Sequence, residues 1–322
     1  KRLVYIVFVF FIISILMFFI YKSMPGDPVT MMLGESRNNM KPEAYQALYD
    51  RTRQELGLDK PLVVQYFIWI ANMLTGDFGY STQYKRQVID VIGTPMVNTL
   101  LLNALSMVVT FVIAIPLGIA TAVRKNGVFD KFVQVITIVG YSLPSFIIAL
   151  LMIFAFAVKI PIFPISGVRT AGLQGNTLQL VLDTLWHMAL PVIVMSISGI
   201  GSITRYVRAE MIDVLRMDYI KTARAKGLKE KTVIYVHAFR NALIPIVTIA
   251  TAWVVSLFGG SIVIENVFLW HGLGQMLING LLQRDFSIVL TMQMFYVILS
   301  LAGNVIMDVA YTIVDPRVRL EN

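Results

Sequence analysis

The residues that most often perform chemistry in proteins are scarce in this chain and form no catalytic motif. There is no cysteine, which excludes disulfides, thiolate metal sites and cysteine nucleophiles. The three histidines, His187, His237 and His271, lie far apart and form no HExxH-type pair. Neither GxxxxGK[ST] nor GxSxG occurs, so a phosphate-binding loop and a nucleophile elbow are both missing. We predict that this chain is not an enzyme and that it binds no metal or cofactor itself.

Polar side chains inside long apolar segments are the remaining candidates, because burying them away from water is expensive. Glu265 follows such a segment, where it either contacts a partner or caps a break before a short helix. Four amides are further candidates for a pathway or gate: Asn98, Asn103, Gln293 and Asn304. Amides of this kind either line a wet pathway or hydrogen-bond between helices, and the sequence leaves both alternatives open.

These candidates must be positioned by membrane-spanning helices. Of the 322 residues, 57% are hydrophobic and only 14% are charged, a balance that excludes a water-soluble globule. A span needs about 20 mainly apolar residues, and six segments qualify. They are Leu3–Tyr21, Val97–Val123, Phe132–Val158, Trp186–Ile203, Ala242–Ile264 and Phe286–Ile313. We read the first as a retained span, because it is too long for the apolar core of a signal peptide.

The distribution of Lys and Arg predicts the orientation. Sixteen of the 27 basic residues lie at the two termini and in the connections on one side of the six spans, and three lie in the short connections opposite. Basic residues in short connections favour the cytoplasmic side, so both termini are expected in the cytoplasm. The excess of eight positive charges is therefore read as a topology signal, and we expect no nucleic acid as partner. The glycine-rich strings at 259–261 and 272–274 are read as helix breaks.

The external segment, residues 23–96, is expected to be structured. Pro42 and Gly57 enclose a polar stretch with helix start and stop signals. A second helix is expected at Pro61–Leu74, which is too short to span and rich in aromatic residues. The interpretation we favour is a packed external cap. Direct contact with a solute is the alternative.

The long connection 205–245 is the most informative stretch. Asp218 is expected to cap a helix of about two turns that ends at Gly227, while Ala223 and Ala225 reduce side-chain bulk along it. A short, basic helix with small residues suits insertion into a groove of another protein. An ordinary positively charged loop is the alternative, but it would not need two helical patterns.

At this point the sequence resembles the permease subunits of ATP-binding-cassette importers, within the dipeptide/oligopeptide/nickel permease family. The resemblance rests on YIKTARAKG followed by HAFRNALIP, which is similar to that family's coupling loop, and on PGDP, GDFGYS, SLPSF, ENVFLWHGLG and DPRVRL in order along the chain. It assigns ATPase coupling to Asp218, Lys221, Thr222, Ala223, Ala225, Gly227, Leu228 and Pro245. The glutamate of the general motif falls on Lys221.

The resemblance implies an all-α membrane protein with six helices and the type I importer permease fold. The expected division is a first helix at 1–22, an external segment at 23–96, a five-helix core at 97–314 and a cytoplasmic tail at 315–322. The implied partners are a second related permease, two cytoplasmic ATPases that bind ATP and Mg, an external solute-binding protein and the lipid bilayer of a bacterial inner membrane.

The expected function is peptide import. Nickel, glutathione or short oligosaccharides are the alternatives within the family. A membrane scaffold or an intramembrane enzyme are the alternatives outside it. An enzyme would need a converging acid, base or nucleophile, and none is visible in the sequence. A scaffold would not need a coupling helix.

Overall fold

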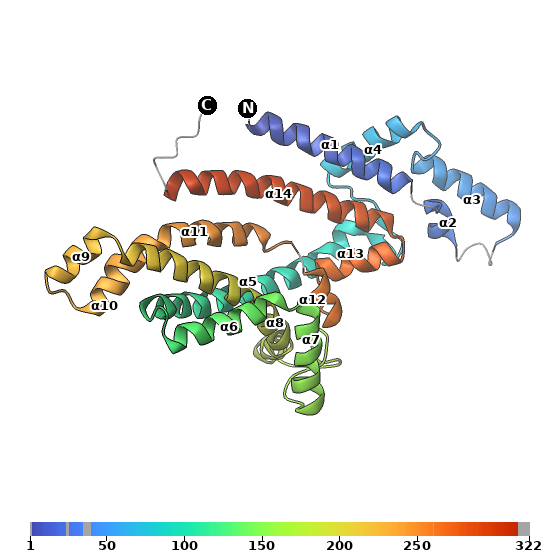
Figure 1. Ribbon diagram of the computed structural model, residues 1–322. Helices are drawn as coiled ribbons and strands as arrows, with labels where there is room; N and C mark the ends of the chain where they lie inside the picture. Colours follow the sequence, from blue (N-terminus) through green and yellow to red (C-terminus); the bar gives the residue numbers. More distant parts are fainter. Residues whose placement is uncertain (1, 24–25, 35–39, 260, 315–322) are drawn as a thin grey trace. The chain divides into compact units, whose positions relative to one another are not determined.

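The computed structural model describes residues 2–23, 26–34, 40–259 and 261–314, most of which are helical (Figure 1). Four helices are long and apolar enough to cross a membrane. They are α1 (Arg2–Lys22), α5 (Val88–Val123), α8 (Thr177–Leu215) and α14 (Phe286–Val314). Two bent helix pairs bring the total to six if each pair is one span, which agrees with the six segments expected from the sequence.

The third expected span is not a single helix. It consists of α6 (Val128–Ser142), α7 (Ser145–Ile153) and the π-helical segment η2 (Phe154–Lys159), and the chain bends by 99° between the first of these and the rest. The break falls at Leu143 and Pro144. Proline lacks the backbone N–H of a helix interior and disfavours helical geometry in the residue before it, so the expected span Phe132–Val158 is present as a bent pair of helices, a break that the apolar run did not indicate.

The fifth expected span is shorter than its apolar run. It is formed by α10 (Glu230–Thr232), the π-helical segment η3 (Val233–Ala238) and α11 (Phe239–Ser256). The expected end at Ile264 was wrong, because α11 stops just before the glycine-rich string at 259–261. Two short helices follow, α12 (Ile262–Val267) and α13 (Leu273–Leu282). Gly259 and Ser261 lie between α11 and α12, and Gly272 lies between α12 and α13, so the predicted helix breaks are present at the described residues of both strings.

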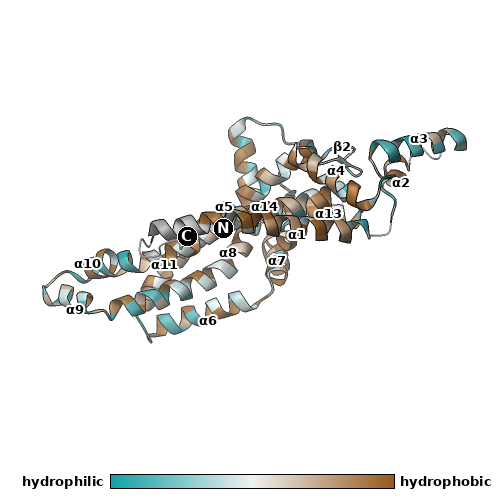
Figure 2. Cartoon of the chain, turned by 90° about the horizontal axis from the view of Figure 1, so that it is seen from above, coloured by the Kyte–Doolittle hydropathy of each residue, from teal (hydrophilic) through white to brown (hydrophobic). Residues whose placement is uncertain are grey.

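The chain divides into two compact units, one of 1–96 with 276–301 and one of 97–275 with the end of α14. The first unit contains α1, α2 (Pro28–Leu33), α3 (Pro42–Glu55) and α4 (Leu62–Leu74), so both helices predicted in the external segment are confirmed. Helix α3 is mostly hydrophilic (Figure 2). A short antiparallel hairpin of β1 (Tyr80–Ser81) and β2 (Arg86–Gln87) leads directly into α5.

In the first unit, Asp285 joins this hairpin to the start of α14. Its carboxylate is completely buried and accepts hydrogen bonds from the Ser81 hydroxyl and from the backbone N–H of Gln83. The other carboxylate oxygen accepts from the N–H of Ile288, at 3.3 Å. A buried carboxylate needs several donors, and here the hairpin and the first turn of α14 supply them.

In the second unit, α8 is the central helix and packs against α6, α7 and α11. Glycines permit the close approach. A Cβ atom on Gly118 of α5 would lie 2.6 Å from the Val207 side chain of α8, and one on Gly201 of α8 would lie 2.8 Å from the Thr137 carbonyl of α6. Small residues at such contacts let helix backbones pack closely in membranes.

Candidate functional site in the connection between α8 and α11

The helix expected in the long connection is α9 (Asp218–Ala225). Asp218 does not cap it, contrary to the prediction. Met217 occupies the N-cap position without a side-chain cap, and Asp218 is the first helical residue. Its carboxylate accepts a 2.8 Å hydrogen bond from Lys221 one turn later, because a side chain inside the first turn lies beside the next turn. This ammonium lowers the pKa of Asp218.

The C-terminal end of α9 is closed by Gly227, as predicted. Its φ is +75°, a left-handed conformation that glycine adopts without steric cost. Its N–H donates to the Arg224 carbonyl at 2.9 Å, and the N–H of Leu228 donates to the Ala223 carbonyl at 3.4 Å. This double closure is a Schellman motif, which gives the short helix a defined end.

The inner face of α9 packs against its own chain. Ile220 is fully buried and Ala223 is 7% exposed, and both belong to one hydrophobic cluster with Met211 of α8 and with Val233 and Ala238 of η3. The small side chain of Ala223 therefore serves close packing within this connection. Ala223 does not lie on the exposed surface of α9.

The outer face of α9 combines apolar and basic side chains. Tyr219 is 44% exposed, and Met217 and Leu228 are also exposed. The remaining exposed positions are Asp218, Lys221, Thr222, Arg224, Ala225, Lys226, Gly227 and Lys229. In Figure 1, α9 and α10 form the tip of a projection beyond the ends of α8 and α11. We call the exposed residues from Met217 to Lys229 the coupling face.

Met217 and Tyr219 are members of the coupling face that the sequence did not single out. The spacing of Ile220 and Ala223 was the available signal, since residues three apart share one face of a helix and the residues between them then face away. Large exposed apolar residues are typical of contact sites when they form a patch.

An ion pair fixes α9 to α10. The guanidinium of Arg224 donates to Glu230 at 2.6 and 3.2 Å, and this contact lowers the pKa of Glu230. Both side chains are about half exposed, so the pair contributes at most about 1 kcal/mol to stability. Its effect is geometric, because the two-point contact sets the orientation of α9.

Pro245, assigned to the same connection by resemblance, lies inside α11. The chain bends by 53° between Glu230–Leu243 and Pro245–Val254. Kinks of this size are expected at a proline, which removes a helical hydrogen bond. Pro245 therefore separates the projection from the apolar part of α11.

Glu265 lies in the first turn of α12 and is completely buried. Its carboxylate accepts from the Thr99 hydroxyl at 2.8 Å and from the N–H of Gln275 at 3.0 Å. Thr99 in turn accepts from the N–H of Leu273 at 2.8 Å. Of the two roles considered for Glu265, this arrangement is that of a cap: the carboxylate satisfies backbone donors at the start of α13.

The amide candidates lie in different surroundings. The side-chain amide of Asn98 donates to the His271 carbonyl at 2.7 Å, and the backbone carbonyl of Asn98 accepts from the Trp270 indole at 3.1 Å.

Asn103 donates to the Leu257 carbonyl and lines a cavity of about 220 Å³. Gln293 is half-buried and Asn304 is exposed, both on α14. Asn98 and Asn103 thus join elements of the second unit, and neither of their hydrogen bonds is to another of the four amides.

One buried ion pair was missed from the sequence. Arg208 of α8 donates twice to Asp130 of α6, both at 2.7 Å. The same carboxylate accepts from the N–H of Asn126 and from Gln134, both at 2.8 Å. Asp130 is completely buried. The partners are separated by 78 residues, and no local pattern pairs them.

A multi-pass helical protein with an exposed amphipathic helix between two spans has the arrangement of a transporter permease subunit. The family of binding-protein-dependent transport system inner membrane components matches residues 114–320, and the corresponding N-terminal family matches residues 1–103. The chain therefore belongs to this family of importer permeases.

Relatives agree along nearly the whole length. The oligopeptide transport system permease protein AppB of Bacillus subtilis is 38% identical over 307 residues, covering 95% of this chain and 94% of the relative. A putative peptide permease of Brucella suis is 35% identical, covering 96% and 94%. The glutathione transport system permease protein GsiC of Escherichia coli is 34% identical, covering 99% and 97%.

A solved structure supports the fold. The inward-facing MetNI methionine ABC transporter matches with a TM-score of 0.51 at 19% identity, covering 69% of this chain and 97% of that chain. At this identity the match bears on the fold alone. It agrees with the type I importer permease fold expected from the sequence.

Proposed function

We propose that this chain is the membrane-spanning permease subunit of an ATP-driven peptide importer, and that its coupling face docks on a cytoplasmic ATPase. The observation that carries the proposal is the two-sided burial of α9. Ile220 and Ala223 hold the helix to α8 and η3, while Tyr219 and Leu228 remain exposed beside basic residues. Such a helix transmits force because one face is anchored and the other is available to a partner.

The relatives support peptides as the transported class, since two of those compared are named as oligopeptide or peptide permeases. The glutathione permease relative keeps a modified tripeptide as the second candidate. In the proposed complex, a second related permease completes the pathway, and two ATPases bind ATP and Mg. An external binding protein delivers the solute.

In the proposed mechanism, closure of the ATPases moves α9 as a rigid lever. Changing an inward-to-outward equilibrium from 1:99 to 99:1 needs about 5.5 kcal/mol. The helix must carry its share of this energy without unfolding. The Gly227 closure and the buried inner face are the features that resist unfolding.

The substrate class is tested by ATPase stimulation. In proteoliposomes containing the full complex, the binding protein loaded with short peptides is expected to stimulate ATP hydrolysis. The same binding protein exposed to nickel is expected to leave the rate of ATP hydrolysis unchanged. Unloaded binding protein is the control. Stimulation by nickel alone would remove the peptide assignment and leave the importer architecture standing.

The orientation of the chain is a second expectation, proposed here with both termini in the cytoplasm of a bacterial cell. Gln46 of α3 and Lys229 of the coupling face are both exposed. Single cysteines at these positions are expected to react with a membrane-impermeant reagent from opposite sides, Gln46→Cys in intact cells and Lys229→Cys only after permeabilisation. The native chain has no thiol to interfere. Labelling of both in intact cells would contradict the orientation.

A further inference from the structure

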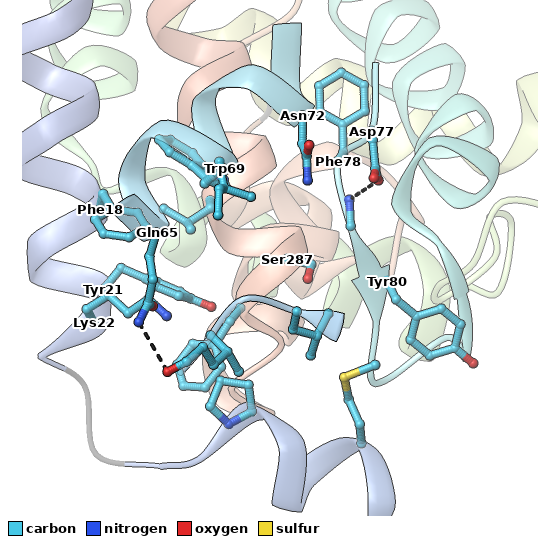
Figure 3. A pocket seen from close by; sticks show the side chains of 18 of the residues that line it. Phe18, Tyr21, Lys22, Gln65, Trp69, Asn72, Asp77, Phe78, Tyr80 and Ser287 are labelled. Carbon is cyan, nitrogen blue, oxygen red and sulfur yellow. Dashed lines mark hydrogen bonds between the residues drawn. The ribbon is translucent and has the colours of Figure 1, made fainter. Parts of the chain in front are cut away.

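A cavity of about 320 Å³ lies inside the first unit, between the C-terminal end of α1, helix α4 and the start of α14 (Figure 3). Several aromatic rings line it. Tyr21 packs edge-on against Phe286 with ring centroids 4.5 Å apart, and Phe18 contacts Trp69 at 5.6 Å. Ligand sites are typically concave, mainly apolar and equipped with a few polar groups. This cavity lies at the small end of their usual volume, about 300 Å³.

Two buried polar atoms at this cavity have no hydrogen-bond partner among the described residues. They are the hydroxyl of Tyr21, whose side chain is only 8% exposed, and the Oε1 atom of Gln65. Figure 3 shows both residues at the cavity. Buried polar atoms are nearly always paired, so these two atoms call for polar partners inside the cavity, which ordered water or the polar groups of a solute can supply.

The orientation of Gln65 is fixed by its other end. Its amide nitrogen donates to the carbonyls of Leu58 and Lys60, at 3.2 and 2.7 Å. Both N–H bonds of this nitrogen are used in this way. The Oε1 atom, which is an acceptor, is therefore the part of the Gln65 amide left to bind an occupant. The Tyr21 hydroxyl can donate. A single peptide group presents the matching pair, one N–H and one C=O.

The charges at the cavity also match a free peptide. One cation, Lys22, and two carboxylates, Glu55 and Asp77, line it. A short peptide carries one carboxylate and one ammonium group. Two carboxylates in the lining disfavour an anionic lipid headgroup, and lipid acyl chains would leave Tyr21 and Gln65 unpaired.

We infer that this cavity is a solute site on the first unit, which receives one apolar residue of a short free peptide. The peptide C=O accepts from Tyr21, the peptide N–H donates to Gln65, and the side chain lies among the aromatic rings. The cavity of about 320 Å³ is large enough to hold one leucine or phenylalanine side chain. This inference rests on the proposed peptide transport and gives the external segment a role beyond a packed cap.

The test uses the assembled importer in lipid nanodiscs without its binding protein. The probe is a tripeptide with a photoreactive benzophenone on its central residue. After irradiation, mass spectrometry is expected to locate the label on α1, α4 or the start of α14. Tyr21→Phe is expected to weaken probe binding about two- to tenfold, the range of one neutral hydrogen bond. It should not lower the melting temperature, because the hydroxyl has no partner to lose.

Matched variants separate binding from folding. Tyr66→Phe removes a hydroxyl that is paired with Ser14 at 2.7 Å, so it is expected to lower the melting temperature and leave probe binding unchanged. Asn72→Trp adds bulk at an exposed position of α4 that lines the cavity and is expected to abolish labelling. Val63→Trp changes an exposed position of α4 outside the cavity lining and is expected to have no effect.

Three results would overturn the inference: labelling that Tyr21→Phe and Asn72→Trp leave unchanged, labelling confined to the second unit, or a co-purifying phospholipid displaced by Asn72→Trp. Labelling that requires the binding protein would instead assign the cavity to a segment of that protein, which also contradicts a free-peptide site.

Peptide uptake with the binding protein present is measured in parallel. Uptake without labelling rejects only the cavity site, whereas lack of uptake of any peptide rejects the proposed function.

Discussion

Ala225→Glu is expected to reduce coupled peptide transport about 100-fold while α9 stays folded. Ala225 is exposed at the end of α9, so a longer side chain meets no neighbour in the chain itself. In the complex, the new carboxylate would be placed unpaired in the interface with an ATPase, where a like-charge or unpaired contact costs several kcal/mol. ATP hydrolysis coupled to uptake in proteoliposomes measures the effect.

Ala223→Glu gives a contrasting result on the same helix. Ala223 lies inside the cluster with Met211 and Val233, and burying an unpaired carboxylate there is expected to release α9 from its own chain. Transport is lost in both variants, but only Ala223→Glu should make the connection sensitive to protease. Lys125→Glu, at an exposed position of the turn between α5 and α6, is the control and should transport normally. Normal transport by Ala225→Glu would show that the coupling face is not the docking surface.

Asp130→Ala is expected to cause the largest loss of stability. It removes the carboxylate that accepts two hydrogen bonds from Arg208 at 2.7 Å, and it leaves a partly buried guanidinium without a counter-charge. Removing one partner of a buried ion pair costs about 3–5 kcal/mol. For a domain of this size, the thermal midpoint should fall by roughly 10 °C. Thermal unfolding of the purified protein in detergent is the measurement.

A double variant checks the cause. Asp130→Ala with Arg208→Met removes both charges and is expected to recover much of the lost stability, because replacing a whole buried pair with apolar residues is often neutral. Arg205→Met is the matched control. Arg205 is exposed on the same helix and lies over the Tyr141 ring at 5.0 Å, so its loss should cost less than about 1 kcal/mol. Equal losses for Arg205→Met and Asp130→Ala would contradict an essential role of the ion pair.

The helical plan could be predicted because its signals are local. A span is defined by the hydropathy of its own residues, and α3 is bounded by Pro42 and a closing Gly57 in the sequence itself. Errors occurred where an apolar run was longer than its helix. The run through Leu143 and Pro144 is continuous in hydropathy but broken in backbone, since proline alters geometry without altering apolar character.

The candidate site could be predicted in position but only partly in arrangement. The helix in the connection and its end at Gly227 follow from residue types with fixed conformational preferences. Whether Ala223 points inward and Ala225 outward depends on the helix phase relative to α8 and η3. Small residues fit either a buried contact or a docking face, so their identity alone could not decide.

The sequence by itself determined the spans and the place of the helix in the connection between α8 and α11, because hydropathy and turn residues act over short stretches of chain, while its motifs carried the resemblance to importer permeases. Only the tertiary structure decided which polar residues meet. Asp130 and Arg208 lie 78 residues apart, Thr99 and Glu265 lie 166 apart, and Tyr21 and Gln65 come together only when α1 and α4 face one cavity. Hydrogen bonds and ion pairs act over a few ångströms. Their partners are therefore chosen by helix packing, which no local pattern in the chain encodes.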